Sequence, residues 1–300
     1  MAATAPGAGN TSGPTSGPTP DQVGEMYDEF GDMLAMMLGG TAVHIGMYVP
    51  HGDRPPVTSL IGLADIGQDQ QTEFLIDTID LGPDAHLLDI GCGTGGPAIR
   101  LAERSGARVT GITVSRGQLA HCEERQRASS AAERVEFARA NAMQLDYADA
   151  SFDAAWSIDC IPHLSDRPAG LREAHRVLRP GGRFLMTEFA LRGVPDEAGV
   201  AAYTELWTCP PPRPFAQLLA EVEEAGFRVT KVQSMTSNAV LSGELMNALY
   251  QERRDEIEER YGKEVTARTD PLVRPFRDFC RDHVDYYLLL LRKEGDAERR

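Results

Sequence analysis

The segment LLDIGCGTGGPAIRLA, residues 87–102, constrains the fold of this chain more than any other. An apolar run leads into a turn that holds four glycines, and a helical pattern follows that Pro97 can begin. Glycine lets the backbone turn tightly and pass close to a ligand. The segment therefore predicts a strand, a ligand-binding turn and a helix, the opening unit of a nucleotide-binding α/β domain.

Further apolar runs alternate with helical patterns along the chain. Strands that alternate with helices predict parallel pairing and a sheet covered on both faces. We therefore expect an α/β, Rossmann-like fold with a seven-stranded, mostly parallel sheet, helices on both faces and a helical lid. The seven expected strands are 86–91, 108–113, 134–140, 152–158, 183–189, 227–233 and 286–292.

The chain divides into a tail and one domain. Residues 1–19 consist largely of Thr, Ser, Gly and Pro, and such a composition predicts a disordered tail. The rest, 20–300, forms the domain, with an N-terminal helical cap at 20–80. An insert at about 234–284, rich in helix formers, separates the last two strands and is expected to form two helices of a lid. Ligands of open α/β sheets bind at the strand ends that such a lid would cover.

The charge and the cysteines of the chain limit the kinds of partner that it could bind. A net charge of −15 repels phosphate backbones, so a nucleic-acid substrate is excluded, and no apolar run is long enough to span a membrane. The start of the chain lacks a secretory pattern, so we expect a cytoplasmic protein. The five cysteines form no metal-binding pattern, and no metal is expected. A homo-oligomer could form through the lid or the N-terminal helix.

The glycine turn also completes the GxGxxG pattern of dinucleotide-binding oxidoreductases. That interpretation requires an acidic residue about 20 positions further on for the ribose. The second expected strand ends instead with Thr113 and Ser115, although Arg116 could meet an NADP phosphate. An NADP-binding reductase therefore remains an alternative of another class.

Three segments together resemble the class I S-adenosylmethionine (SAM)-dependent methyltransferases. LDIGCGTGGPA is similar to their first motif, ANAMQLDYADASFDAAWSID to their third and fourth, and HRVLRPGGRFLMTEF to the helix, turn and fifth strand that follow. Residues 20–48 resemble the N-terminal region of natural-product methyltransferases from antibiotic and terpenoid biosynthesis. That group includes the rebeccamycin sugar O-methyltransferase and the geranyl diphosphate C-methyltransferases.

This resemblance implies SAM as the cofactor and a set of residues that hold it. Asp89 would lie near the amino-acid end of SAM, Thr113 and Gln118 would hold the ribose hydroxyls, and Asn141 would accept a hydrogen bond from the adenine amine. Tyr27 and the loop at 44–48 would close over the cofactor. The expected cofactor-binding residues are Asp89, Gly91, Gly93, Gly95, Thr113, Gln118, Asn141, Ala142 and Ser157.

The catalytic candidates follow the fourth and fifth strands. Relatives carry two adjacent histidines after the fourth strand, whereas this chain has Pro162 and then His163, a candidate general base. Asp159 and Glu188 could bind the substrate, act as a base or stabilise positive charge. Tyr27 completes the catalytic set. Each also has a plainer interpretation: Tyr27 as a core residue, His163 as part of a helix start, Asp159 as a contact to the ammonium group of SAM, and Glu188 as half of a surface ion pair.

The function predicted is methyl transfer from SAM to a small apolar secondary metabolite. The Met- and Leu-rich lid and the lack of a dense basic patch slightly favour C-methylation of a prenyl or terpenoid alkene. O-methylation of a sugar or hydroxylated scaffold is the close alternative. A third is a protein of this fold that binds SAM without methyl transfer or carries out a cyclisation.

Overall fold

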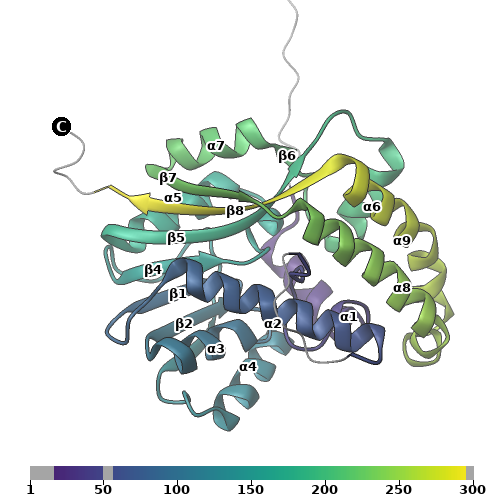
Figure 1. Cartoon of the computed structure of the whole chain (residues 1–300), viewed down its shortest axis with the longest axis horizontal. Coiled ribbons are helices and arrows are strands. Elements are labelled where there is room, and N and C mark those ends of the chain that lie inside the picture. Colours follow the sequence, from purple (N-terminus) through teal and green to yellow (C-terminus); the bar gives the residue numbers. More distant parts are fainter. Residues whose placement is uncertain (1–16, 50–56, 295–300) are drawn as a thin grey trace, which may run out of the picture.

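A computed structural model of the chain describes residues 17–49 and 57–294 (Figure 1). Most of the predicted disordered tail, 1–16, lies outside the described residues. The strands are β1 His86–Ile90, β2 Arg108–Thr113, β3 Val135–Arg139, β4 Phe152–Ser157, β5 Leu178–Leu191, β6 Arg213–Pro214, β7 Phe227–Ser234 and β8 Val284–Lys293. The helices are α1 Pro20–Leu38, α2 Leu60–Ile79, α3 Gly96–Ser105, α4 Arg116–Ala128, the 3₁₀ turn η1 Ile161–His163, α5 Arg167–Val177, α6 Glu197–Trp207, α7 Phe215–Glu224, α8 Thr236–Tyr261 and α9 Lys263–His283.

The strands form one sheet in the order β3-β2-β1-β4-β5-β8-β7. Pairing is parallel from β3 to β5, and β8 runs antiparallel to both of its neighbours. The mostly parallel α/β fold predicted from the sequence is therefore confirmed. An eighth strand, the two-residue β6, pairs with the end of β5, and a segment this short leaves no periodic pattern to detect.

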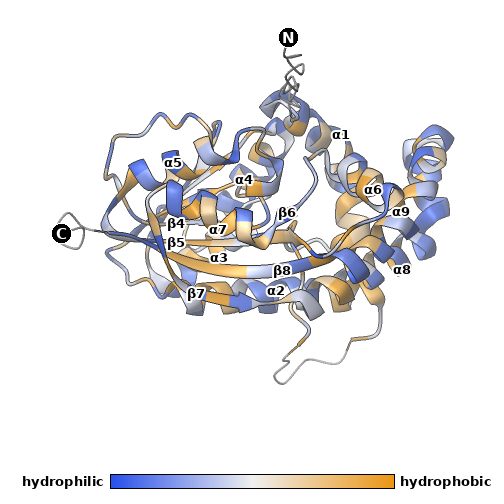
Figure 2. Ribbon diagram, turned by 90° about the horizontal axis from the view of Figure 1, so that it is seen from above, coloured by the Kyte–Doolittle hydropathy of each residue, from blue (hydrophilic) through white to orange (hydrophobic). Residues whose placement is uncertain are grey.

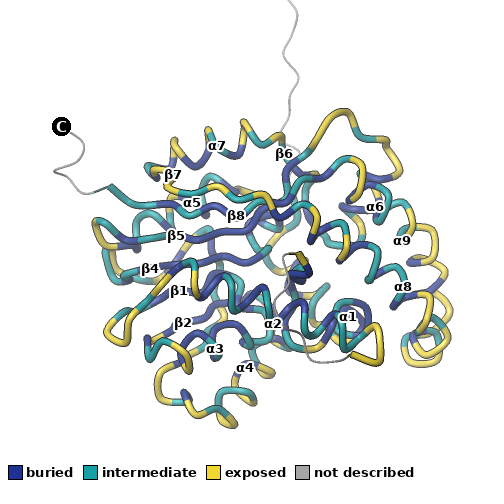
Figure 3. Tube along the Cα trace, in the orientation of Figure 1, coloured by how far each residue is buried: buried dark blue, intermediate teal, exposed yellow. Residues whose placement is uncertain are grey.

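Apolar side chains on both faces of the sheet hold the layers together. Leu87 packs in a core cluster with α2 and α3, whereas its neighbour Leu88 packs in a second cluster with α5 and α7. Successive strand residues point to opposite faces, so a strand buried on both sides reads as a continuous apolar run. The central strands are largely hydrophobic in Figure 2 and mostly buried in Figure 3, whereas the edge strand β7 has an exposed residue at every second position.

A third apolar cluster lies beyond one end of the sheet, where α1 packs with α6, α8 and α9. Thr19 begins α1 with a capping box, in which its side chain and that of Gln22 each accept a hydrogen bond from the other residue's backbone N–H. Helices α8 and α9 occupy the segment predicted to form the lid insert. Among the helices of residues 17–49 and 57–294, none is both long and apolar enough to cross a membrane.

Candidate cofactor and acceptor site

The turn after β1 has the backbone conformation that its glycines predict. Gly91, Gly93 and Gly95 have φ angles of 80°, 54° and 80°, in the left-handed region that favours glycine. The N–H groups of Gly91 and Cys92 both donate to the Ile112 carbonyl, 2.9 Å away, which ties the turn to β2. A Cβ atom at Gly91 would collide with the Cys160 side chain, whereas one at Gly93 would meet only Val43, 4.0 Å away.

A cavity of about 700 Å³, here the cofactor cavity, lies against this turn. It brings together residues that the sequence assigned to the cofactor from three consecutive strand ends. The cofactor residues predicted from sequence that line it are Gly91, Gly93, Thr113, Gln118, Asn141 and Ala142. The Thr113 hydroxyl donates to Gln118 Oε1 at 2.7 Å, and Asn141 Oδ1 accepts from the Met143 N–H at 2.9 Å.

The surroundings of the Asp89 carboxyl show whether this site fits SAM. Its side chain lines a small adjoining cavity of about 280 Å³ beside Gly91 and Gly93. Its Oδ2 is buried without a hydrogen-bond partner among the described residues, and burial raises the pKa of the carboxyl to about 7. A cationic amino group at this position would supply the missing donor and charge. The Asp89 carboxyl therefore fits the amino-acid end of SAM, which carries such an amino group.

A second cavity of about 660 Å³, here the acceptor cavity, adjoins the first beneath the lid. Tyr27, Val43, Asp159 and His163 line both cavities and so lie between them. Four aromatic rings also line the acceptor cavity, those of Phe189, Tyr203, Trp207 and Phe276. No lysine or arginine is among its described lining residues, so it lacks the positive charge that a diphosphate requires.

Tyr27 and His163 form a hydrogen-bonded pair where the cavities meet. The Tyr27 hydroxyl lies 3.1 Å from His163 Nε2, and the two rings meet edge to face. Burial lowers the pKa of His163 to about 4 and raises that of Tyr27 far above its usual range. Both groups are therefore neutral near pH 7, with a hydroxyl that can donate to the unprotonated ring nitrogen.

Asp159 is held at the same junction by groups from distant parts of the chain. Its Oδ1 accepts from the hydroxyls of Thr187, at 2.6 Å, and Tyr286, at 2.7 Å, while its Oδ2 accepts from the Ile45 N–H at 3.1 Å. The backbone of Asp159 has a φ of 55°, which is strained for a residue other than glycine. These three hydrogen bonds fix the orientation of the Asp159 side chain.

The segment around the predicted closing loop at 44–48 is hydrogen-bonded to helix α8 of the lid. Asn238 on α8 accepts from the N–H groups of Tyr48 and Val49 at 2.6 and 2.8 Å, and donates to the Val49 carbonyl at 2.9 Å. The Gly46 N–H donates to Ser242 Oγ, also on α8, at 3.1 Å. This fastening positions Val43 and His44 in the cavity walls.

The remaining predicted residues lie apart from the two main cavities. Ser157 is fully buried near the end of β4 and lines neither cavity, and Gly95 lies in the same turn as Gly93 but outside the lining. Glu188 follows Thr187 on β5, so its side chain points to the opposite face of the sheet from the hydroxyl that holds Asp159. It is 1% exposed, which is incompatible with a surface ion pair, and its Oε1 accepts from the Phe189 N–H.

Several site residues escaped the sequence analysis, chiefly Thr187, Asn238 and Tyr286. Each contacts the site across a large separation in sequence, and no local motif indicates such contacts. In the described part of the chain, no group of three or more His, Cys, Asp or Glu side chains could hold a metal ion.

The sequence of this chain is similar to those of known methyltransferases. A family described as a methyltransferase domain matches residues 88–186. The methyltransferase GfsG of Streptomyces halstedii is 34% identical over 240 residues, which cover 79% of this chain and 84% of the relative. The O-methyltransferase resE of Aspergillus sclerotiorum is 32% identical over 217 residues, covering 72% and 79%.

Solved structures extend the likeness to almost the whole chain. The [4+2]-cyclase SpnF superposes with a TM-score of 0.79 at 30% identity, covering 93% of this chain and 98% of that one. A geranyl diphosphate C-methyltransferase of Streptomyces coelicolor, solved with Mg²⁺, geranyl diphosphate and S-adenosylhomocysteine, has a TM-score of 0.72 at 21% identity, covering 92% and 99%. The second likeness is one of fold. These comparisons give no support to an NADP-binding reductase.

Proposed function

This chain belongs to the SAM-dependent methyltransferases that act on secondary metabolites, and we propose that its acceptor is a hydroxyl group on a largely apolar molecule. The Tyr27–His163 pair carries this proposal, because it places a neutral ring nitrogen where the cofactor and acceptor cavities meet. The O-methyltransferase among the relatives supports the same reaction type.

SAM supplies an electrophilic methyl group, so the protein's task is to align the acceptor oxygen and remove its proton. Tyr27 accepts a hydrogen bond from the acceptor hydroxyl and donates its own proton toward His163 Nε2. As the O–CH₃ bond formed and the S–CH₃ bond of the sulfonium broke to leave S-adenosylhomocysteine, the acceptor proton would pass to the Tyr27 oxygen and the tyrosine proton to the imidazole. The enclosing apolar walls exclude water from this transfer.

Asp159 adds a fixed negative charge at the junction. Its carboxylate is oriented by three hydrogen bonds and faces both cavities, where it stabilises positive charge on the cofactor or on the imidazolium that forms. Glu188 and Ser157 have no part in this proposal, since neither lines a cavity.

C-methylation of an alkene is the second candidate. The four aromatic rings of the acceptor cavity and the Asp159 carboxylate favour it, because together they would stabilise a carbocation. The absence of lysine and arginine from the described lining argues for a neutral acceptor in either case.

Matched substrates separate the two reactions. We would incubate the protein with SAM carrying a trideuterated methyl group and a panel of terpenoid and macrolide alcohols, each beside its alkene analogue without the hydroxyl. S-adenosylhomocysteine release measures turnover, and the mass and NMR spectra locate the label. We expect labelled O–CH₃ from the alcohols; equal labelling of the alkenes would instead support C-methylation.

Two variants test the base. His163→Ala should lower turnover of alcohols about 10²- to 10⁴-fold, the usual contribution of a general base. Tyr27→Phe should give a smaller loss that tests the relay. Calorimetric binding of S-adenosylhomocysteine, retained in both, shows that the fold survives. Wild-type turnover by His163→Ala would overturn the proposed base.

A further inference from the structure

A third cavity of about 540 Å³, here the distal cavity, lies among α1, α6, α8 and α9. Its described lining is mostly apolar and rich in methionine, with Met26, Met33 and Met37 on α1. Trp207 and Met246 are the two residues that line both this cavity and the acceptor cavity. These two side chains, here the dividing wall, therefore separate the two spaces.

The dividing wall comes from the end of one helix and the middle of another. Trp207 is the last residue of α6, and Thr208 ends that helix in the left-handed conformation with a φ of 45°. The Trp207 ring is half-buried and lies 5.9 Å from the Phe276 ring, between centroids. Met246 is buried on α8. The indole is rigid, whereas the unbranched methionine can change conformer.

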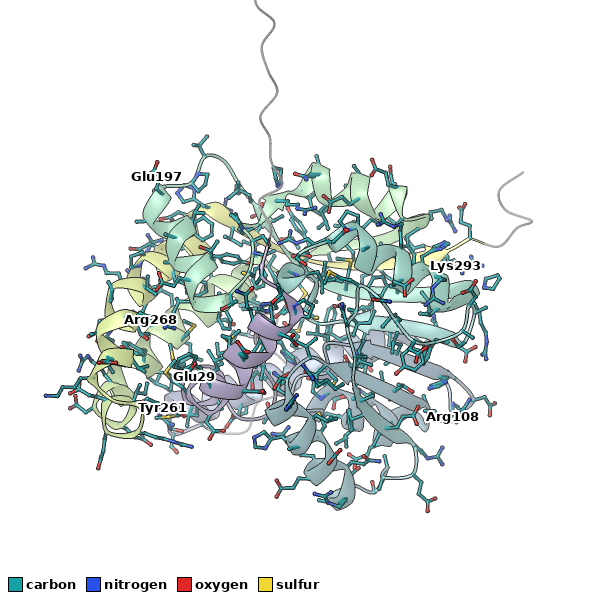
Figure 4. The ribbon with its side chains drawn as sticks, turned by 180° about the vertical axis from the view of Figure 1, so that it is seen from behind. Glu29, Arg108, Glu197, Tyr261, Arg268 and Lys293 are labelled. Atoms are coloured by element: carbon teal, nitrogen blue, oxygen red, sulfur yellow. The ribbon has the colours of Figure 1, made fainter. Side chains whose placement is uncertain are left out.

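The far side of the distal cavity has a different chemistry. Glu205 and Arg268 line it and approach each other to 4.0 Å, with side chains 49% and 63% exposed. The Arg268 guanidinium also lies 5.4 Å from the centre of the Phe30 ring on α1. Figure 4 labels Arg268 on α9, on the lid side of the molecule. The cavity therefore runs from the dividing wall through apolar residues to a charged, solvent-exposed edge.

We propose that Trp207 limits the length of acceptor that the enzyme binds. The apolar part of an acceptor extends from the Tyr27–His163 pair across the acceptor cavity and ends against the indole. The distal cavity beyond the indole is also lined mostly by apolar residues. Trp207, together with Met246, closes it off from the acceptor cavity. The position of the acceptor's reactive end rests on the proposed function, but the limit on its length concerns binding alone.

A homologous series of straight-chain primary alcohols, from hexanol to decanol, probes this limit. Binding is measured by calorimetry with S-adenosylhomocysteine in saturating excess. Each methylene that enters apolar surroundings should tighten binding about fourfold, the equivalent of ~0.8 kcal/mol. In the wild type we expect this gain to stop at a chain length where the alcohol meets Trp207. In Trp207→Ala it should continue for at least two further methylenes, so that decanol binds more than about tenfold tighter than to the wild type.

Four further variants keep the test decisive. Trp207→Phe retains a ring and should move the limit less, and Leu206→Ala, which alters a residue lining the distal cavity alone, should leave it in place. Adding Val265→Phe to Trp207→Ala fills the distal cavity and should restore the shorter limit. Should Trp207→Ala unfold, Met246→Ala opens the same wall from α8 and should also lengthen the series.

The chain itself supplies an optical check, because Trp156 and Trp207 are its two tryptophans. Trp156 is fully buried in β4, so alcohols that reach the dividing wall should shift the emission of Trp207, and Trp207→Phe should abolish the shift. A limit at the same chain length in the wild type and Trp207→Ala, or no binding of any alcohol to the wild type, would overturn this inference. Because no methyl transfer is measured, loss of the base assignment would leave the binding result unaffected.

Discussion

At position 93, the lack of a side chain leaves space at the wall of the cofactor cavity. Gly93 has a φ of 54°, and its missing Cβ would point toward open space beside Val43. Gly93→Val should therefore raise the dissociation constant for S-adenosylhomocysteine at least about 100-fold, equivalent to ~2.7 kcal/mol. Calorimetry measures this loss.

The control is Gly193→Val, at a glycine with a φ of 68° and no atom within 4 Å of its missing Cβ. It should impose similar backbone strain, of about 1–2 kcal/mol, without touching the cavity. Unchanged cofactor affinity in Gly93→Val would mean that the cofactor does not pass over this turn.

Glu188 predicts a pH dependence of stability. Burial raises its pKa from 4.5 to about 7 in the folded chain. Between these values the folded state keeps a proton that the unfolded state has released, so stability falls as pH rises from about 4.5 to 7. Glu188→Gln removes this dependence. The fall in unfolding free energy between pH 5 and pH 8 should be smaller in the variant by roughly 2 kcal/mol.

Urea denaturation at the two pH values measures this difference. Asp89, whose pKa burial also raises to about 7, contributes equally in both proteins and cancels. Glu197→Gln, at an exposed position in the first turn of α6, should behave as the wild type. An identical fall in the wild type and Glu188→Gln would show that Glu188 is ionised in the folded chain.

Residues beside a recognisable motif could be predicted, and those that reach the site from elsewhere could not. Asp159 and His163 follow the fourth strand, where the parallel arrangement places ligands, so their position at the cavities was foreseeable. Tyr286 and Thr187 act on Asp159 across large sequence separations. Glu188 looked equivalent to Asp159 because both lie at strand ends, but the alternation of side chains along β5 turns it away.

Among the elements, α8 holds the segment 43–49, in which Val43 lines both cavities. Asn238→Ala would remove one buried hydrogen bond to the Tyr48 N–H and two half-buried hydrogen bonds to the Val49 backbone. Loss of the partner of a buried N–H costs about 1–3 kcal/mol. We expect faster amide hydrogen exchange in residues 44–49, together with weaker acceptor binding.

Asn238→Asp is the matched variant, because it keeps both accepted bonds and loses the donated one. Its exchange should lie between that of the wild type and Asn238→Ala. If all three proteins exchange alike, α8 does not hold this loop.

Elements with a long periodic pattern were predictable. The seven runs of alternating or continuous apolar residues correspond to β1–β5, β7 and β8, because burial on two faces requires such runs. Strand β6 has two residues, one of them Pro214, and forms only because β5 extends far enough to pair with it. Its existence depends on tertiary structure and not on its own sequence.

For the whole molecule, cofactor binding should appear as stability. A ligand that binds only the folded state at 100 times its dissociation constant adds about 2.7 kcal/mol to the free energy of unfolding. S-adenosylhomocysteine should therefore raise the melting temperature of the purified protein, whereas NADPH at the same concentration should leave it unchanged. Thermal denaturation followed by circular dichroism measures both. A shift with NADPH alone would contradict the assignment of the cofactor.

The lid as a whole was only partly predictable. Two helices between the last strands followed from the helix-forming composition of residues 234–284, but the acceptor and distal cavities depend on how four helices from separate parts of the chain pack. No periodicity within one helix specifies which face of another it meets. The division of the acceptor space by Trp207 is a property of that packing.

The place of β8 between β5 and β7 has a consequence for how the molecule is made (Figure 1). Strand β7 leaves the ribosome before α8 and α9, yet its neighbour in the sheet is translated after them. Until residues 284–293 arrive, β7 lacks its partner strand in the described sheet. One late strand therefore joins β7 to the sheet and, at the same time, anchors the end of α9.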